Sequence, residues 1–207
     1  MTITEIPESW LPSGAKGLVF DLDGTVLDTM KHHWAAWDQT AREHGIALTA
    51  PELLSLAGKP STAIMRLLCE QQGLTIDIDT AVKRKADLYC ELAVTTQPIE
   101  AVMAVARAAK AQGIPVAIAT GGSKRQVTGS MAAAGISTFF DAVVTCDDVT
   151  HGKPHPETFL KAAALIGVEP QHCVGYEDAQ LGMEAIKAAG FLKAIDVTEW
   201  AGYPKLV

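Results

Sequence analysis

Short apolar runs alternate with longer segments of helical periodicity along most of this chain, and this alternation constrains the fold more than any other feature. Between the runs, Ala, Leu and Met recur at three- and four-residue spacing, which is typical of helices. Strands are expected at 18–22, 116–119, 142–145, 173–176 and 194–197. Helices are expected at 98–112, 123–134, 156–166 and 178–189. The alternation predicts an α/β fold with parallel strands and helices on both faces of the sheet.

The interval 30–96 interrupts this rhythm, because it holds helical patterns and no convincing strand. Turns that contain glycine separate the helical patterns from one another. The patterns cover 30–44, 51–57, 61–72 and 79–93. We therefore expect a core domain formed by 1–29 and 97–207, with an α-helical cap domain inserted at 30–96.

Composition indicates the cellular setting. With 207 residues, 48% of them hydrophobic, the chain is large enough for one well-filled core, or for one core plus a small appended domain. No apolar stretch approaches the roughly 20 residues of a membrane helix, and 1–17 lacks the basic patch and apolar core of a secretion signal. We expect a soluble cytoplasmic protein with no membrane partner. Trp34 and Trp37 could belong to a core or to an interface, and we expect a monomer.

The charged residues and the cysteines exclude further classes of protein. The net charge is −7 and the longest basic run is Lys83-Arg84-Lys85, so the chain lacks the electrostatic footprint of nucleic-acid binding. The four cysteines form no C-x-x-C pair, which argues against a zinc site and against a disulfide framework. An anionic substrate would have to be drawn by local positive charge.

Two carboxylates two residues apart follow the first apolar run, in the segment Asp21-Leu22-Asp23-Gly24-Thr25. Strand side chains repeat every second residue, so Asp21 and Asp23 can lean to one side while Gly24 lets the chain turn. An ordinary acidic turn after a strand would show the same pattern. Three further polar segments, each after its own apolar run, favour a functional interpretation, because ligands gather at the carboxyl ends of parallel strands.

Thr120-Gly121-Gly122-Ser123 is the first of these segments, between an expected strand and an expected helix. A hydroxyl and free backbone N–H groups at a helix start suit a phosphate, although an ordinary serine cap after a glycine turn is common. Lys153 lies between Gly152 and Pro154 after the third expected strand. A lysine held there either directs its charge at a phosphate or carboxylate or is an ordinary surface residue.

Glu177-Asp178 follows the fourth expected strand and begins a helix. Acids at a helix N-terminus stabilise the helix dipole, which is the simpler explanation. Clustering these acids near Asp21 and Asp23 would nevertheless be costly without a cation. Hard carboxylate oxygens favour Mg²⁺, which also binds substrate phosphate.

In this order, D-x-D-G-T, T-G-G-S, K-P and E-D resemble the four motifs of the haloacid dehalogenase-like superfamily of phosphohydrolases. The resemblance extends over almost the whole chain, and helices follow the first motif as in the subgroup with a helical cap. Segments 28–37, 140–143 and 175–180 resemble the β-phosphoglucomutase-like branch and its sugar-phosphate phosphatases. The resemblance implies a Rossmann-like core and Mg²⁺-dependent phosphoryl transfer to or from a small phosphorylated metabolite.

The resemblance also implies a role for each motif residue. Asp21 would attack phosphorus and become an aspartyl phosphate, and Asp23 would protonate the leaving oxygen and later deprotonate water. Thr120 and Lys153 would hold the phosphoryl oxygens. The metal set that it implies is Asp21, the Asp23 carbonyl and Asp178, with Glu177 orienting metal-bound water.

In the cap, the resemblance places His33 near the domain hinge and Lys85 at a basic substrate-binding position. A satisfied histidine on a helix is an equally good explanation of His33, and we expect His32 to face solvent. Gly58 and Lys59 lie in the loop that would close over the leaving group and choose the substrate.

The same loop separates two reactions of the branch. Mutases carry a basic residue just before the loop glycine and an arginine after it, to grip a second phosphate, and Ala57 and Thr62 stand there. We therefore expect a phosphatase acting on a small sugar or polyol phosphate, such as a fructose 1-phosphate-like or phosphogluconate-like substrate. The alternatives are a β-phosphoglucomutase-type mutase and a catalytically inactive binding module. The segment before Gly14, with Trp10, could pack along the surface or stay mobile.

Overall fold

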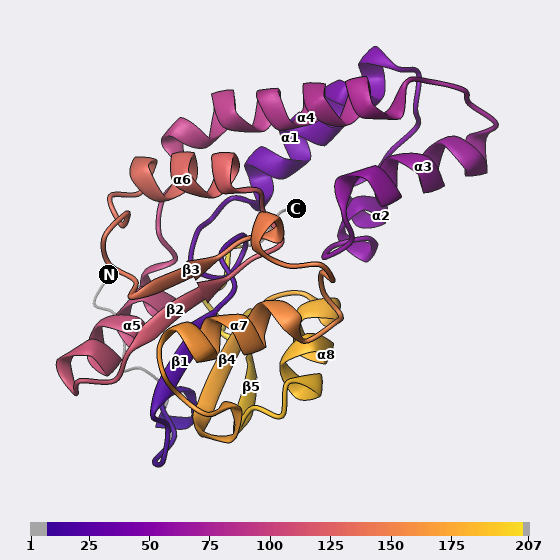
Figure 1. The fold of residues 1–207 in the computed structure, drawn as a ribbon. Coiled ribbons are helices and arrows are strands. Elements are labelled where there is room, and N and C mark those ends of the chain that lie inside the picture. The colour runs from indigo at the N-terminus through magenta and orange to yellow at the C-terminus, as the bar shows by residue number, and fades with distance from the viewer. Residues whose placement is uncertain (1–7, 205–207) are drawn as a thin grey trace.

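The computed structural model describes residues 8–204, and its centre is a five-stranded parallel sheet of order β3-β2-β1-β4-β5 (Figure 1). The strands are β1 (Gly17–Phe20), β2 (Val116–Ala119), β3 (Ala142–Val144), β4 (Cys173–Glu177) and β5 (Lys193–Asp196). All four neighbouring pairs are parallel, so their carboxyl ends meet at one edge of the sheet. The predicted Rossmann-like α/β fold is confirmed, with strand ends that differ from the expected ones by at most two residues.

Helices cover both faces of the sheet. They are α5 (Glu100–Ala111), α6 (Lys124–Ala133), α7 (Glu157–Leu165) and α8 (Gln180–Ala188). Leu18 and Phe20 of β1 pack with α5 and α6, whereas Val19 packs with α7 and α8. Successive strand side chains point to opposite faces, so the uninterrupted apolar β1 contributes to both layers and is fully buried.

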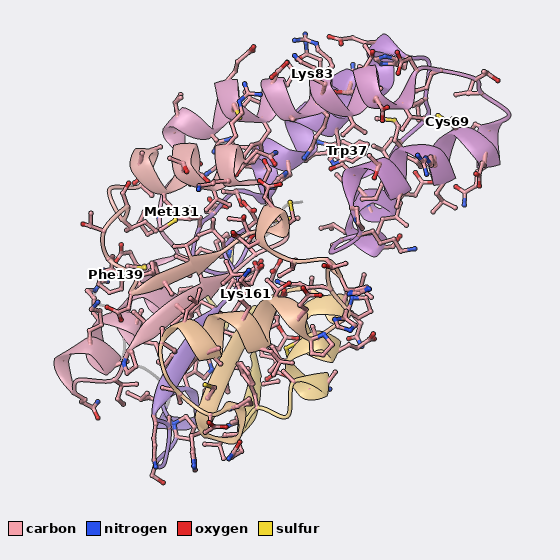
Figure 2. All side chains as sticks on the ribbon, in the orientation of Figure 1. Trp37, Cys69, Lys83, Met131, Phe139 and Lys161 are labelled. Carbon is pink, nitrogen blue, oxygen red and sulfur yellow. The ribbon has the colours of Figure 1, made fainter. Side chains whose placement is uncertain are left out.

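The interval after the first motif folds as four helices at the carboxyl edge of the sheet (Figure 1). They are α1 (Met30–Glu43), α2 (Ala50–Ser55), α3 (Ser61–Gln72) and α4 (Ile78–Leu92). Trp37, Leu53 and Met65 belong to a hydrophobic cluster confined to these helices and their loops. Figure 2 shows Trp37 on the side of α1 that faces α2 and α3. Its side chain is therefore core packing, while the proposed domain boundaries at 29/30 and 96/97 stay a prediction.

Local sequence signals explain where these helices begin and end. Thr49 and Glu52 form a reciprocal capping box at the start of α2, and Asp77 caps α4 through the N–H of Thr80. Gly73 ends α3 in a left-handed conformation with φ of 65°. Short 3₁₀ helices complete the described chain at η1 (Glu8–Trp10), η2 (Ala93–Thr95), η3 (Cys146–Asp148), η4 (Pro170–His172) and η5 (Val197–Glu199).

The described part of the N-terminal segment packs into the core. Trp10 is buried, and its carbonyl oxygen accepts a hydrogen bond from the Tyr176 hydroxyl. This contact explains why an aromatic residue occurs in a segment without strand character. The prediction for residues 1–7 lies outside the described residues. No helix between residues 8 and 204 is both long enough and apolar enough to cross a membrane.

Candidate active site

The carboxyl ends of β1 and β4 bring three acidic side chains and one lysine together. The backbone N–H of Asp21 donates to the Tyr176 carbonyl, which fixes the end of β1 beside the end of β4. Lys153 Nζ lies 2.6 Å from Asp21 Oδ1 and 2.6 Å from Glu177 Oε1. These three side chains are at most 7% exposed, so their charges interact with little solvent screening.

Asp21, Glu177 and Asp178 can offer one ligand atom each to a metal ion, because these atoms lie within 4.8 Å of one another. Thr25 Oγ1 donates to Asp178 Oδ1 at 3.2 Å. The Tyr203 hydroxyl donates to the Gly24 carbonyl at 2.8 Å and lies 3.4 Å from Asp178 Oδ2. These hydrogen bonds orient the Asp178 carboxylate toward the group.

Two glycines make room for these acids. Gly24 has φ of 85°, and a Cβ there would collide with the Asp178 carboxylate. A Cβ at Gly182 on α8 would collide with the Glu177 carboxylate. Glu177 is held more tightly than the sequence indicates, because Oε2 accepts from the N–H groups of Asp178 at 2.8 Å and Ala179 at 2.6 Å. Both of its oxygens are thus engaged.

The electrostatics of this group fit a divalent cation. Burial raises the pKa of Asp21 to about 7, since the Lys153 charge only partly offsets it and Glu177 and Asp23 add negative charge. Burial and the charges of Glu177 and Asp21 raise the pKa of Asp178 well above its usual range. One lysine does not neutralise this set of buried oxygens. An oxygen-preferring cation such as Mg²⁺ would restore the ionised form of both aspartates.

The end of β2 supplies a surface suited to phosphate. Thr120 is buried, and its Oγ1 accepts the N–H of Gly122 at 3.0 Å, which leaves the hydroxyl proton for another acceptor. A Cβ at Gly122 would lie 3.4 Å from Asp23 Oδ2. The turn of Gly121 and Gly122 thus lies beside the Asp23 carboxylate, with its backbone N–H groups near the end of β2.

The cap surrounds the second aspartate. His33 Nε2, on α1, lies 3.3 Å from Asp23 Oδ1, and the Tyr89 hydroxyl, on α4, donates to the same oxygen at 3.0 Å. The His33 and Tyr89 rings stack with centroids 4.1 Å apart. Lys85 is buried, and its Nζ donates to His33 Nδ1 at 2.9 Å. Because Nδ1 accepts from an ammonium, His33 is neutral and presents the Nε2 proton to Asp23.

The pKa values in this network follow from its contacts. Burial lowers the pKa of Lys85 to about 8. Burial and the Lys85 charge lower the pKa of His33. For Asp23, burial alone would raise the pKa, but the hydrogen bonds that it accepts from His33, Thr29 and Tyr89 lower it. Asp23 is therefore ionised in this arrangement.

The cap loop and the C-terminal segment form the walls of a cavity of about 560 Å³. Lys59 lines it from the cap, while Asp178, Leu181 and Tyr203 line it from the core. Gly58 has φ of 86°, and a Cβ there would lie 3.1 Å from Leu181 Cβ. The loop thus rests directly on α8, and the cavity opens onto the Asp178 carboxylate.

The sequence prediction that His32 faces solvent is wrong. His32 is 7% exposed and forms a buried i, i+4 stripe on α1 with Ala36 and Thr40. Its Nε2 has no hydrogen-bond partner among the described residues, and burial lowers its pKa. The prediction failed because Trp37 and Ala41 are buried beside this stripe, so the buried face of α1 is wide enough to include His32.

Comparisons with known proteins agree with this geometry. A family model described as haloacid dehalogenase-like hydrolase matches residues 15–190. Fructose-1-phosphate phosphatase YqaB of Escherichia coli is 34% identical over 182 residues, covering 87% of this chain and 95% of that protein. Hexitol phosphatase A of Escherichia coli is 34% identical over 203 residues, covering 92% of this chain and 87% of that protein.

A solved structure shows the same architecture. β-Phosphoglucomutase from Clostridium difficile superimposes with a TM-score of 0.75 at 25% identity, covering 86% of this chain and 83% of that chain. The family model spans both the first acidic motif and the Glu177-Asp178 pair, and thus every motif that carried the resemblance. The sequence prediction of the family is confirmed, and this chain belongs to the haloacid dehalogenase-like hydrolases.

Proposed function

We propose that this protein is a Mg²⁺-dependent phosphatase that hydrolyses a small sugar or polyol phosphate through an aspartyl-phosphate intermediate. The observation that carries the proposal is the placement of Asp21: Lys153 Nζ lies 2.6 Å away, and Asp178 belongs to the same group of possible metal ligands. Asp23 lies two residues further on, held by His33 and Tyr89 of the cap. A nucleophile, a charge-neutralising group and a proton donor thus meet at one sheet edge.

The reaction uses the two aspartates in turn. A carboxylate oxygen of Asp21 forms a bond to phosphorus while the bond from phosphorus to the sugar oxygen breaks, and Asp23 gives its proton to that oxygen. Asp23 then takes a proton from water, whose oxygen attacks the aspartyl phosphate and releases inorganic phosphate and the Asp21 carboxylate. The same carboxyl group serves as acid and then as base.

The protonation of Asp23 depends on the substrate. In the absence of substrate, His33 and Tyr89 favour the carboxylate form. A phosphate group that lies between Asp21 and Asp23 brings negative charge, which raises the pKa of Asp23 and favours proton uptake. The neutral imidazole of His33 keeps the carboxyl oriented in both forms.

Asp21, Asp178 and the backbone carbonyl of Asp23 would hold the metal ion. When bound, Mg²⁺ would reduce the charge repulsion between the carboxylates and the phosphate. Lys153, the Thr120 hydroxyl and the N–H groups of the Gly121-Gly122 turn would hold the phosphoryl oxygens. Glu177, which both Lys153 and the start of α8 hold in place, would orient the water near this group.

The cap loop and the names of two relatives support the substrate class. The relatives are named for fructose 1-phosphate and for hexitol phosphates. Lys59 is the one basic side chain of the cavity wall within residues 8–204, and the guanidinium that could hold a second phosphate is absent from the positions of Ala57 and Thr62. A substrate with one phosphate and a neutral polyhydroxy chain fits this wall.

A phosphate-release assay tests the proposal. Fructose 1-phosphate, sorbitol 6-phosphate, 6-phosphogluconate and β-glucose 1-phosphate are offered at fixed Mg²⁺ and again with a chelator. We expect Mg²⁺-dependent turnover of at least one of them and loss of turnover in Asp21→Asn. Asp38→Asn, on the exposed face of α1, is the matched control and keeps wild-type turnover. Normal turnover by Asp21→Asn would exclude the covalent route.

A sugar-phosphate mutase is the second candidate, because the superimposed structure from Clostridium difficile is a β-phosphoglucomutase. Product analysis by ³¹P NMR separates the two reactions. A mutase interconverts hexose 1- and 6-phosphates in a manner that depends on a bisphosphate activator and releases little free phosphate. A phosphatase yields inorganic phosphate as the only new phosphorus signal.

A further inference from the structure

A second group of metal-ligating side chains lies on the loop that leads into α7, apart from the acidic group of the active site. The loop reads His151-Gly152-Lys153-Pro154-His155-Pro156-Glu157. Lys153 points inward and is buried, whereas the side chains of His151 and His155 are 63% and 51% exposed. The two imidazoles flank Lys153 at equal spacing on the outer side of the loop.

Glu157 holds this outer group together. Its Oε1 accepts the backbone N–H of Thr150 at 2.8 Å, and its Oε2 accepts the backbone N–H of His151 at 2.9 Å. Nδ1 of His151 lies 3.0 Å from Oε2, and Nδ1 of His155 lies 3.9 Å from the same oxygen. The carboxylate is thus fixed by the backbone, with two imidazole rings beside it.

The geometry points to a metal site. His151, His155 and Glu157 can each offer one ligand atom, and these atoms lie within 4.8 Å of one another. The two imidazole rings have centroids 4.7 Å apart. Ligand atoms about 2.0–2.1 Å from a tetrahedral ion lie about 3.3 Å from one another. The distances of 3.0 and 3.9 Å to the Glu157 oxygen bracket that value. His155 Nδ1 also accepts the backbone N–H of Glu157 at 3.3 Å, so a metal bound through Nδ1 would replace that hydrogen bond.

We propose that His151, His155 and Glu157 form a surface site for a divalent transition metal ion, for which Zn²⁺ is the probe. Two imidazoles and one carboxylate suit Zn²⁺, and a water molecule would fill a fourth position. Mg²⁺ prefers oxygen ligands and an octahedral shell, so the two sites select different ions. This site does not depend on the proposed phosphatase activity.

Binding would also restrict the loop that carries Lys153. Both histidines lie two residues from Lys153, and an ion shared with Glu157 would tie the loop to the first turn of α7. The folded protein would gain stability from any ion that binds it more tightly than the unfolded chain. We expect Zn²⁺ to raise the melting temperature of the full-length protein in saturating Mg²⁺.

Calorimetric titration of the full-length protein with ZnCl₂ in saturating Mg²⁺ tests the site. We expect one saturable binding event, and a dissociation constant raised at least about tenfold in His151→Gln and in His155→Gln. The double variant His151→Gln/His155→Gln loses the event. The control His44→Gln/His172→Gln changes two histidines outside the loop and keeps it. Both changed positions in the double variant are exposed, and circular dichroism verifies its fold.

Histidine NMR gives a second measurement that does not depend on affinity. The chain has six histidines. We expect Zn²⁺ to shift the ring signals of two of them, and the double variant, which lacks His151 and His155, should lack those two signals. In the Co²⁺-substituted protein, a thiolate charge-transfer band would instead assign binding to a cysteine such as the exposed Cys146. That band, the absence of saturable binding, or unchanged binding in the double variant would each overturn the proposal.

Discussion

The core half and the cap half of the candidate active site hold their side chains by different means. In the core half, Asp21, Lys153 and Glu177 make ion pairs of 2.6 Å at the ends of parallel strands. In the cap half, neutral His33 and Tyr89 reach Asp23 across the boundary between helices and sheet. In the core half, the carboxylates are positioned by their place at the strand ends and by the Lys153 ion pairs. In the cap half, the contacts to Asp23 depend on how α1 and α4 lie against the sheet.

This difference separates the two steps of the proposed chemistry. The nucleophile and its neutralising lysine come from the core half, so they are in place wherever the cap lies. The environment of the proton donor comes largely from the cap half. Changes in the core half should therefore cost both stability and turnover, whereas changes in the cap half should alter proton transfer with a smaller effect on stability.

Lys153→Met should give the largest effect, because it leaves the buried carboxylates of Asp21 and Glu177 without their partner. We expect a loss of about 3–5 kcal/mol in the free energy of unfolding with a chelator present and a fall of about 1000-fold in kcat/KM. Urea unfolding and phosphate release measure the two quantities. Lys187→Met, on the exposed end of α8, is the control and should change neither.

Lys85→Met tests the buried cation of the cap half. The pKa of Lys85 is lowered from 10.5 to about 8 in the folded protein, so between these values the unfolded chain binds more protons than the folded one. Between pH 8 and pH 10.5, the free energy of unfolding of the wild type should therefore rise relative to that of the variant by about 3 kcal/mol in total. Below pH 8 the difference should be flat. Urea unfolding at several pH values checks this, and an identical pH dependence in both proteins would contradict it.

Tyr89→Phe removes one hydroxyl from the cap half and keeps the ring that stacks on His33. The hydrogen bond helps to lower the pKa of Asp23, so its loss should raise that pKa and shift upward the limb of the pH–rate profile that reports Asp23. We expect kcat to fall about tenfold, as for a lost hydrogen bond to a charged group. Tyr176→Phe is the control, because the Tyr176 hydroxyl donates to Trp10 instead, and an unshifted pH–rate profile in Tyr89→Phe would refute the coupling.

Tyr203→Phe should give the smallest effect and tests the contacts that orient the Asp178 carboxylate in the core half. Its hydroxyl contacts the Gly24 carbonyl and Asp178, which belongs to the proposed metal set. We expect the Mg²⁺ concentration for half-activation to rise about threefold, with kcat at saturating Mg²⁺ unchanged. Mg²⁺-induced thermal stabilisation should weaken in parallel. Equal Mg²⁺ dependence in Tyr203→Phe and the wild type would show that this hydroxyl does not orient the aspartate.

The core half could be predicted from the sequence because its geometry follows from topology. Asp21, Thr120 and Glu177 each come directly after a short apolar run, and parallel pairing brings the ends of such runs together. Their contacts were less predictable. The hydrogen bonds of Glu177 to the start of α8, and the need for Gly182 beside it, depend on the angle of a helix that spacing does not define.

The residues that sequence reasoning missed lie where topology gives no rule. Tyr89 lies on an inserted helix, 66 positions from Asp23, and an aromatic residue there looks like ordinary core packing. Tyr203 follows the last strand, and the short turn from Trp200 brings it back to the first motif. A periodic tyrosine four residues after Lys85 was the available signal for Tyr89, because both then share one face of α4.

The stacked pair of His33 and Tyr89 links two properties that are usually considered apart. His33 lies on α1, whose first residue Met30 lines the cavity, and together with Tyr89 on α4 it lowers the pKa of Asp23. A descendant that remodels α1 to accept another sugar would at the same time change the pKa of Asp23. Divergence of substrate preference in this lineage would therefore be accompanied by drift in the pH optimum, even with every core motif unchanged.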